Sequence, residues 1–269
     1  MSEKPRLFQI RVSHYSEKAR WALSFKRVEY RGSYPPPGAH VAFAMWLTRG
    51  EMHTLPVLKI DGERIGDSTR IVAELERRWP DPPLYPEDPT DRGRALAIED
   101  YFDEEVGPHA RLLAWHEAIQ DPKAFGEFAK QLAPAPLDRL GSVSGPIASG
   151  FLRLRYGVAS KEAAEAARRQ IVAGFDRVEA ELGSGEYLVG DRFGVADLTA
   201  AALLYPIVLP PEAPKLPPPP EPLARFRDSL SDRPGFEWVQ EMFRRHRRVA
   251  LGGDEQGPAR RAAADPERR

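Results

Sequence analysis

The sequence predicts a small α/β domain followed by an all-helical domain. Between residues 6 and 79, short apolar runs typical of strands alternate with stretches whose apolar residues recur at helical spacing. After a cluster of prolines at positions 80 to 89, the apolar spacing is helical only. A chain of 269 residues is long enough for two modest domains. The predicted division is an α/β domain at 1–79, a proline-rich linker at 80–90, an all-helical domain at 91–249 and a disordered tail at 250–269.

The composition excludes several classes of protein. The chain has no cysteine, which excludes a disulfide framework, a zinc finger, an iron–sulfur cluster and a cysteine nucleophile. Its 39 basic and 40 acidic residues nearly cancel, so neither nucleic acid nor an anionic membrane is an expected partner. No apolar stretch approaches the ~18 residues of a membrane span, and the N-terminus lacks the apolar core of a secretory signal. A cytoplasmic protein without a bound metal is expected.

Local patterns place the elements of the first domain. Asp61-Gly62 between two apolar runs is a strong hairpin signal, because a type I′ turn needs positive φ at both central residues. Pro80 stops the last helix of this domain. In chain order, the expected elements are a strand at Arg6–Val12, a helix capped by Ser13 or Ser16, a short strand around Val28–Ser33, a helix near His40–Thr48, strands at Val57–Ile60 and Glu63–Ile65, and a helix capped by Asp67 or Ser68.

The second half is expected to consist of helices. The predicted features are a long helix capped by Thr90 that continues past Pro108, a helix that Ser160 opens and Gly183 stops, a helix capped by Gly194 with Asp197 at its third position, an extended loop from Pro206 to Pro222, and a basic helix end at Arg244–Arg248. The basic run is expected to lie on a solvated face.

Three short patterns in the first domain could carry chemistry. Ser13 lies where a strand meets a helix, so its hydroxyl and the helix N–H groups could stabilise an anion. A cis peptide bond before Pro56 would turn the N–H and C=O of Leu55 outward, toward an extended peptide ligand. The next helix begins at Asp67-Ser68, which could hold an amine and a carboxylate. Taken singly, each pattern is explained as well by an ordinary helix cap or an edge-strand proline.

Their order and spacing resemble the N-terminal domain of the cytosolic glutathione S-transferases, in particular a serine-type, bacterial-like member. The resemblance is carried by SHYSEKARWAL (13–23), TLPVL (54–58), GDSTRIVAELERRWP (66–80) and, in the helical half, YLVGDRFGVADLTAA (187–201). It implies the glutathione transferase fold, which is an α/β thioredoxin-like N-terminal domain plus an all-α C-terminal domain. Gly194 departs from the family, which usually has Ser or Thr at this helix cap.

The resemblance also implies a role for each matched residue. Ser13 would be the catalytic residue that faces the sulfur of glutathione, Leu55 with a cis Pro56 would pair with its cysteinyl backbone, and Asp67 and Ser68 would bind its γ-glutamyl end. The candidates for the glycyl carboxylate are His53, Thr54, His40 and Arg49. The candidates for the pocket of the second substrate are Tyr15, His109, Arg111, Trp115 and His116.

The function implied is a transferase that uses glutathione as co-substrate and activates its thiolate for attack on a small electrophile. A homodimer is expected from the family. Three alternatives stay open: a glutathione-dependent isomerase or dehalogenase, a non-catalytic member of the fold, and another small thiol in place of glutathione. Because the chain has no cysteine, the branches of the family that form a mixed disulfide with glutathione are excluded.

Overall fold

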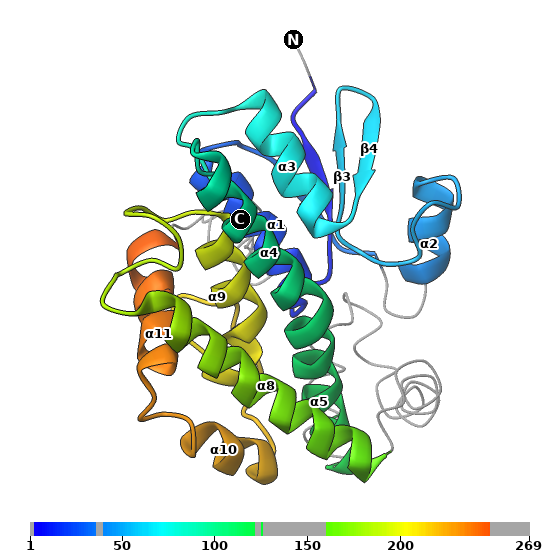
Figure 1. Ribbon diagram of the computed structural model, residues 1–269. Coiled ribbons are helices and arrows are strands. Elements are labelled where there is room, and N and C mark those ends of the chain that lie inside the picture. Colours follow the sequence, from blue (N-terminus) through cyan, green and yellow to red (C-terminus); the bar gives the residue numbers. More distant parts are fainter. Residues whose placement is uncertain (1–2, 36–39, 122–124, 126–159, 248–269) are drawn as a thin grey trace, which may run out of the picture.

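The computed structural model describes residues 3–35, 40–121, 125 and 160–247. It shows an α/β domain and a helical domain packed on each other, with helix α1 (His14–Phe25) between them (Figure 1). The predicted thioredoxin-like fold with a helical C-terminal domain is confirmed. The predicted tail lies outside the described residues.

The first domain has a four-stranded sheet in the order β2-β1-β3-β4. Its elements are β1 (Arg6–Phe8), α1, β2 (Arg31–Ser33), α2 (His40–Leu47), β3 (Val57–Ile60), β4 (Glu63–Gly66) and α3 (Ser68–Arg78). Strands β1 and β2 are parallel, whereas β3 runs antiparallel to both β1 and β4. Asp61 and Gly62 have φ values of 46° and 84°, which confirms the predicted hairpin turn.

The second domain is built from helices. They are α4 (Pro89–Tyr101), the π-helical turn η1 (Phe102–Val106), α5 (Gly107–Gln120), α8 (Lys161–Leu182), α9 (Val195–Val208), α10 (Glu221–Asp228) and α11 (Pro234–His246). Helix α9 is buried along its whole length, and α1, α4, α5 and α11 pack around it. No helix of the described residues is long and apolar enough to cross a membrane.

The π-helical turn lies where the sequence has Pro108. Proline has no N–H to donate to the preceding turn, and here the N–H of Gly107 bonds to the carbonyl of Phe102, five residues back. The widened turn and the residue that follows it bring two carbonyls to α1. The Tyr15 hydroxyl donates to the carbonyl of Asp103 at 2.7 Å, and His14 Nε2 donates to that of Gly107 at 3.0 Å. The π turn therefore joins the two domains.

Several predicted boundaries were wrong. The first strand ends at Phe8 rather than Val12, because the N–H of Ile10 turns to the hydroxyl of Ser16. Strand β2 is likewise shorter than predicted. Helix α4 is capped by Asp88, not Thr90, since the Asp88 carboxylate accepts from the N–H groups of Thr90 and Asp91 and Pro89 begins the helix.

The second proline segment is also shorter than predicted. Pro206 lies in the last turn of α9, and Pro222 lies in the first turn of α10. The connection between these helices therefore spans only residues 209–220. A proline in a first turn loses no hydrogen bond, so the helix can begin before the proline run is complete.

Candidate functional site

The three N-terminal patterns meet at one edge of the sheet. The strand register places Ser33, Phe8, Val57 and Gly66 in a single row across the four strands. Phe8 and Gly66 are the last residues of their strands, whereas Val57 is the first residue of β3. The loop that leads to Ser13, the Leu55-Pro56 pair and Asp67-Ser68 therefore all leave the sheet at this edge. The strand register thus accounts for the three patterns lying at the same end of the sheet.

Ser13 is the N-cap of α1. Its hydroxyl oxygen accepts a hydrogen bond from the N–H of Ser16 at 3.3 Å, and the side chain is half-buried. A serine hydroxyl has two lone pairs and one proton, so accepting this bond leaves the proton to be donated to another group. The positive end of the α1 dipole lies at the same point. Ser13 can thus stabilise an anion that binds at the N-terminus of α1.

The other two patterns flank this helix end. The Leu55–Pro56 bond is cis, as expected, and both residues are buried. Asp67 is exposed and caps α3, accepting from the N–H groups of Thr69 and Arg70. Its φ of 72° is rarely adopted by a residue other than glycine. Ser68 is 3% exposed at the first position of α3.

The candidates for the glycyl carboxylate lie on the connection between α2 and β3 or at the ends of α2. His53 and Arg49 are exposed, whereas Thr54 and His40 are half-buried. Thr54 and His53 directly precede Leu55, so they leave the same edge of the sheet. All four residues therefore stay candidates for binding the glycyl carboxylate.

The five candidates for the second-substrate pocket are divided between two places. The guanidinium of Arg111 lies 5.6 Å from the centre of the Tyr15 ring, close to the N-terminus of α1. His109 donates from Nδ1 to the carbonyl of Glu105 at 2.5 Å on the first turn of α5. Farther along the same helix, Trp115 packs in a small apolar cluster with Ile119, and His116 is buried. Of the five, Tyr15 lies two positions from Ser13 in the chain, and Arg111 is in contact with Tyr15.

Comparison with known families agrees with this geometry. The family model described as "Glutathione S-transferase, N-terminal domain" matches residues 7–83, and the one described as "Glutathione S-transferase, C-terminal domain" matches residues 161–241. The chain belongs to the glutathione S-transferase family.

Individual relatives are distant. A probable maleylacetoacetate isomerase of Caenorhabditis elegans is 26% identical over 205 residues, which make up 76% of this chain and 79% of that protein. The holo structure of a bacterial maleylpyruvate isomerase, described as a glutathione S-transferase of the Zeta class, has a TM-score of 0.57 and 22% identity, and covers 90% of this chain and 95% of its own. The glutathione-bound theta-class transferase of Xanthomonas axonopodis pv. citri also has a TM-score of 0.57, with 19% identity and coverage of 93% and 100%. These structures share the fold.

Behind the site of this transferase lies a buried ionic cluster. The Lys18 ammonium donates to Asp103 Oδ2 at 2.5 Å and to Thr69 Oγ1 at 2.7 Å, and it lies 2.9 Å from Glu99 Oε1. The Lys18 side chain is 0% exposed. Burial alone would lower the pKa of Lys18, but the two carboxylates raise it. The cluster ties α1 to α3 and to the first helices of the second domain.

His14 stays neutral in this interface. Burial, together with the nearby guanidinium of Arg111, lowers the pKa of His14 to about 3.

A Cβ on Gly107 would lie 2.6 Å from the Tyr15 hydroxyl oxygen, so only glycine allows this close approach. Both His14 and Tyr15 thus serve as contacts between the two domains of the transferase.

Sequence reasoning missed a second group of buried charges. The charged residues Glu17, Lys18 and Arg20 belong to SHYSEKARWAL, but no role was predicted for them from the sequence. All three are buried because α1 packs against both α3 and α9. The spacing of Glu17 and Arg20 by three residues was an available signal for a helical ion pair. Arg247 was expected on a solvated helix end, but it is 8% exposed and pairs with Glu17.

The cap of α9 leads to a prediction about stability. The buried Asp197 carboxylate accepts from the N–H groups of Leu188 at 2.8 Å and Gly194 at 2.9 Å. Because glycine has no side chain, Asp197 alone supplies the side-chain cap. We expect Asp197→Ala to lower the free energy of unfolding by about 2–4 kcal/mol, since two buried N–H groups lose their acceptor. Urea unfolding at fixed pH measures this loss.

The same variant carries a pH signature. Burial raises the pKa of Asp197 from 3.8 to about 7, although the backbone N–H groups oppose the rise. A folded-state pKa above the unfolded value gives stability that is complete below pH 4 and is lost as the pH rises through 7. The difference between wild type and Asp197→Ala should therefore shrink between pH 5 and pH 8. A difference that grows over this range would contradict the prediction.

Proposed function

We propose that this transferase binds glutathione at the sheet edge described above and activates its thiol for reaction with a small electrophile. The observation that carries the proposal is the single row across the sheet, which brings Ser13, Leu55-Pro56 and Asp67-Ser68 to one place. The matching positions in the sequence resemble the glutathione site of the family. Serine rather than cysteine or tyrosine as the activating residue is part of this proposal.

Each group of glutathione has a chemically suitable partner in this arrangement. The thiolate would accept a hydrogen bond from the Ser13 hydroxyl at the positive end of α1, which lowers the pKa of the thiol. The cysteinyl backbone would pair with Leu55, and the γ-glutamyl carboxylate would meet the N-terminus of α3 at Ser68. The exposed Asp67 carboxylate would pair with the γ-glutamyl amine. Its unusual φ supports a functional reason for the local geometry.

The remaining parts of the proposal have two sources. A homodimer is expected from the family, whereas a cytoplasmic location and the absence of a metal are expected from the sequence itself. Among the residues that the structure describes, no three His, Asp or Glu side chains gather as a metal site. The electrophile would lie beside Ser13, near Tyr15 of α1 and Arg111 of α5, which form a cation–aromatic pair between the two domains.

Calorimetric titration with reduced glutathione tests this binding site. We expect saturable binding to the wild type, and a dissociation constant about 10- to 100-fold higher for Ser68→Ala, because a hydrogen bond to a charged carboxylate is lost. The matched control is Ser24→Ala, which removes a similarly buried serine from the far end of α1 and should leave the affinity unchanged. Equal affinity in the wild type and Ser68→Ala would refute the assigned site. Absence of binding up to millimolar concentrations would point to another thiol or a non-catalytic role.

A glutathione-dependent isomerase is the second candidate. The relative from Caenorhabditis elegans is named a maleylacetoacetate isomerase, a name that denotes a substrate with carboxylate groups. The guanidinium of Arg111 beside Tyr15 is a suitable group to receive such a carboxylate. An isomerase regenerates glutathione in each cycle, whereas a conjugating enzyme consumes one glutathione per product. Measuring free thiol during turnover of each electrophile that reacts therefore separates the two activities.

A further inference from the structure

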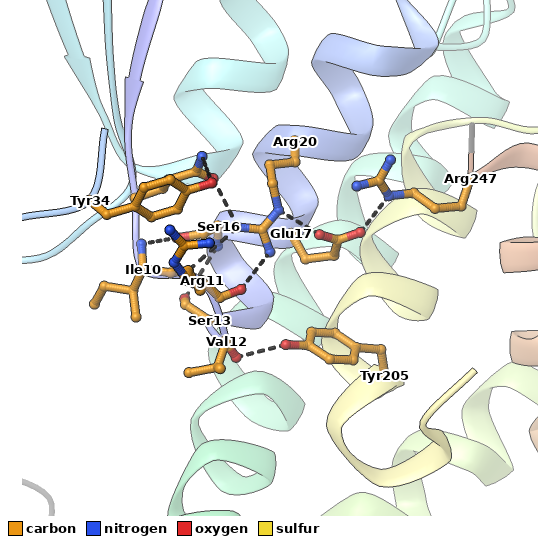
Figure 2. Close-up of polar contacts among 11 residues, drawn as sticks. Ile10, Arg11, Val12, Ser13, Ser16, Glu17, Arg20, Tyr34, Tyr205 and Arg247 are labelled. Atoms are coloured by element: carbon orange, nitrogen blue, oxygen red, sulfur yellow. Dashed lines mark hydrogen bonds and ion pairs between the residues drawn. The ribbon is translucent and has the colours of Figure 1, made fainter. Parts of the chain in front are cut away.

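The loop that presents Ser13 is held by side chains as well as by two backbone hydrogen bonds, from the N–H of Gln9 to the carbonyl of Ser33 in β2 and from the N–H of Ser13 to that of Ile10. Residues Gln9–Val12 follow the end of β1, and the carbonyls of Ile10, Arg11 and Val12 accept hydrogen bonds from side chains of α1 and α9 (Figure 2). Arg20 donates to the carbonyl of Arg11 at 3.0 Å and to that of Ile10 at 3.4 Å. The Tyr205 hydroxyl donates to the carbonyl of Val12 at 2.7 Å. The position of Ser13 therefore depends on these donors.

Arg20 is itself held in place by Glu17. The Arg20 Nε donates to Glu17 Oε2 at 2.7 Å, and its Nη1 donates to the side-chain oxygen of Gln9 at 2.8 Å. Both charged side chains are buried, at 3% and 0% exposed. The Nε of Arg20 therefore binds Glu17, while its Nη1 and Nη2 bind the loop that leads to Ser13 (Figure 2).

The second oxygen of Glu17 is taken by a residue from the end of α11. Arg247 Nε donates to Glu17 Oε1 at 2.5 Å, and the Arg247 side chain is 3% exposed. Although burial alone would raise it, the pKa of Glu17 is held below its usual value by Arg247 and Arg20. The same helix end is fixed on α1 by the Trp21 indole, which donates to the carbonyl of His246 at 3.1 Å. Each carboxylate oxygen of Glu17 therefore binds one arginine.

We infer that Arg247 is a positioning residue for Ser13, acting through Glu17 and Arg20. An arginine prefers to bind both oxygens of a carboxylate with two parallel N–H groups. While Arg247 occupies Glu17 Oε1, Arg20 binds only Oε2 and keeps its remaining donors on the loop. Without Arg247, both oxygens of Glu17 are open to Arg20, which then turns away from the carbonyls of Ile10 and Arg11. This role rests on the proposed function, in which the Ser13 hydroxyl stabilises the thiolate of glutathione.

The test measures the pKa of the bound thiol. Thiolate absorbance of the protein with saturating glutathione, followed against pH, gives this pKa directly. For Arg247→Met we expect it to rise by roughly half a unit to one unit, as when one hydrogen bond to an anion is weakened. The turnover number with an activated aryl halide should fall about 3- to 10-fold, while the glutathione dissociation constant stays within about twofold, because Ser68 and Asp67 are untouched.

A control variant and a double variant test whether Arg247 acts on Ser13 through Glu17. Arg244→Met is the matched control, since Arg244 lies one turn earlier on α11 and pairs only at the surface with Glu241. The double variant Glu17→Gln/Arg247→Met replaces the carboxylate with an amide, which has a single oxygen and cannot bind Arg20 twice. We therefore expect the double variant to regain a bound-thiol pKa close to that of the wild type. It leaves the buried Arg20 without a carboxylate partner, so urea unfolding checks that each variant is folded, and Arg247→Lys, which keeps a cation beside Glu17, tests the inference if either does not fold.

The outcomes separate this inference from the proposed function. Arg247→Lys keeps the charge on a single nitrogen that lacks the planar geometry of a guanidinium, and it should show a smaller shift in the same direction. A bound-thiol pKa that moves in Ser13→Ala but not in Arg247→Met or Arg247→Lys overturns the inference alone. A double variant as impaired as Arg247→Met overturns the route through Glu17. A wild type that binds no glutathione, or a bound thiol that Ser13→Ala does not affect, overturns the proposed function and this inference with it.

Discussion

Replacing Ser13 by alanine should lower the turnover number roughly 100-fold, which is the usual cost of removing one hydrogen-bond donor from an anion that reacts. The hydroxyl oxygen of Ser13 is occupied as the cap of α1, so under the proposed function its proton is the group that would stabilise the thiolate. Glutathione should still bind within about threefold of the wild-type affinity, because its two ends are held elsewhere. Steady-state kinetics with an activated aryl halide, together with calorimetry, measure the two quantities.

A serine with the same structural role provides the control for this variant. Ser160 caps α8, and its hydroxyl accepts from the N–H of Ala163 at 3.1 Å, far along the chain from the site. Loss of either cap should lower the free energy of unfolding by about 1 kcal/mol. Only Ser13→Ala should also lower turnover. If the two variants have equal turnover, Ser13 is a structural cap and another group activates the thiol.

The largest loss of stability is expected for Lys18→Met. The ammonium of Lys18 is shared by Asp103 and Glu99, and it is fully buried. Methionine preserves the volume but leaves two buried carboxylates without a cation. Breaking a buried ion pair in this way costs about 3–5 kcal/mol, because an uncompensated charge remains in the interior. Urea unfolding near neutral pH should show the loss as a lower midpoint.

The loss of stability in Lys18→Met should depend on pH, and it should not occur when an exposed lysine is replaced instead. Burial raises the pKa of Glu99 against the opposing effect of Lys18, so without Lys18 the glutamate takes up a proton more readily and the loss decreases toward acid pH. Lys4→Met removes the same charge from an exposed pair with Glu29 and should leave the midpoint nearly unchanged. A midpoint for Lys18→Met equal to that for Lys4→Met would mean that the cluster contributes nothing to stability.

The fold and the edge of the sheet were predictable because their signals are local. The Asp61-Gly62 turn, the cap at Gly194 and the stop at Gly183 each depend on a few neighbouring residues. The boundaries that were wrong involve competition between neighbours: Asp88 and Thr90 are both good helix caps, and Pro89 decides between them.

The support of the site could not be predicted because it depends on residues far apart in the sequence. Asp103 lies 85 residues from Lys18, and Arg247 lies 230 residues from Glu17. A buried arginine and an exposed arginine look alike in a single sequence until the packing of α11 against α1 is known. The roles of the second-substrate candidates also depend on how α5 packs, so Tyr15 and Arg111 could not be told apart from Trp115 and His116 beforehand.

The contacts around Ser13 bear on when the site forms during synthesis. Every residue proposed to touch glutathione lies within the first 68 positions, so it leaves the ribosome early. The hydroxyl that holds the Val12 carbonyl belongs to Tyr205, and the guanidinium that completes Glu17 belongs to Arg247. A nascent or prematurely terminated chain therefore carries all the ligand-binding residues but not the supports that aim them. Under the proposed function, the geometry that activates the thiol would become complete only after α11 has been made and has docked on α1.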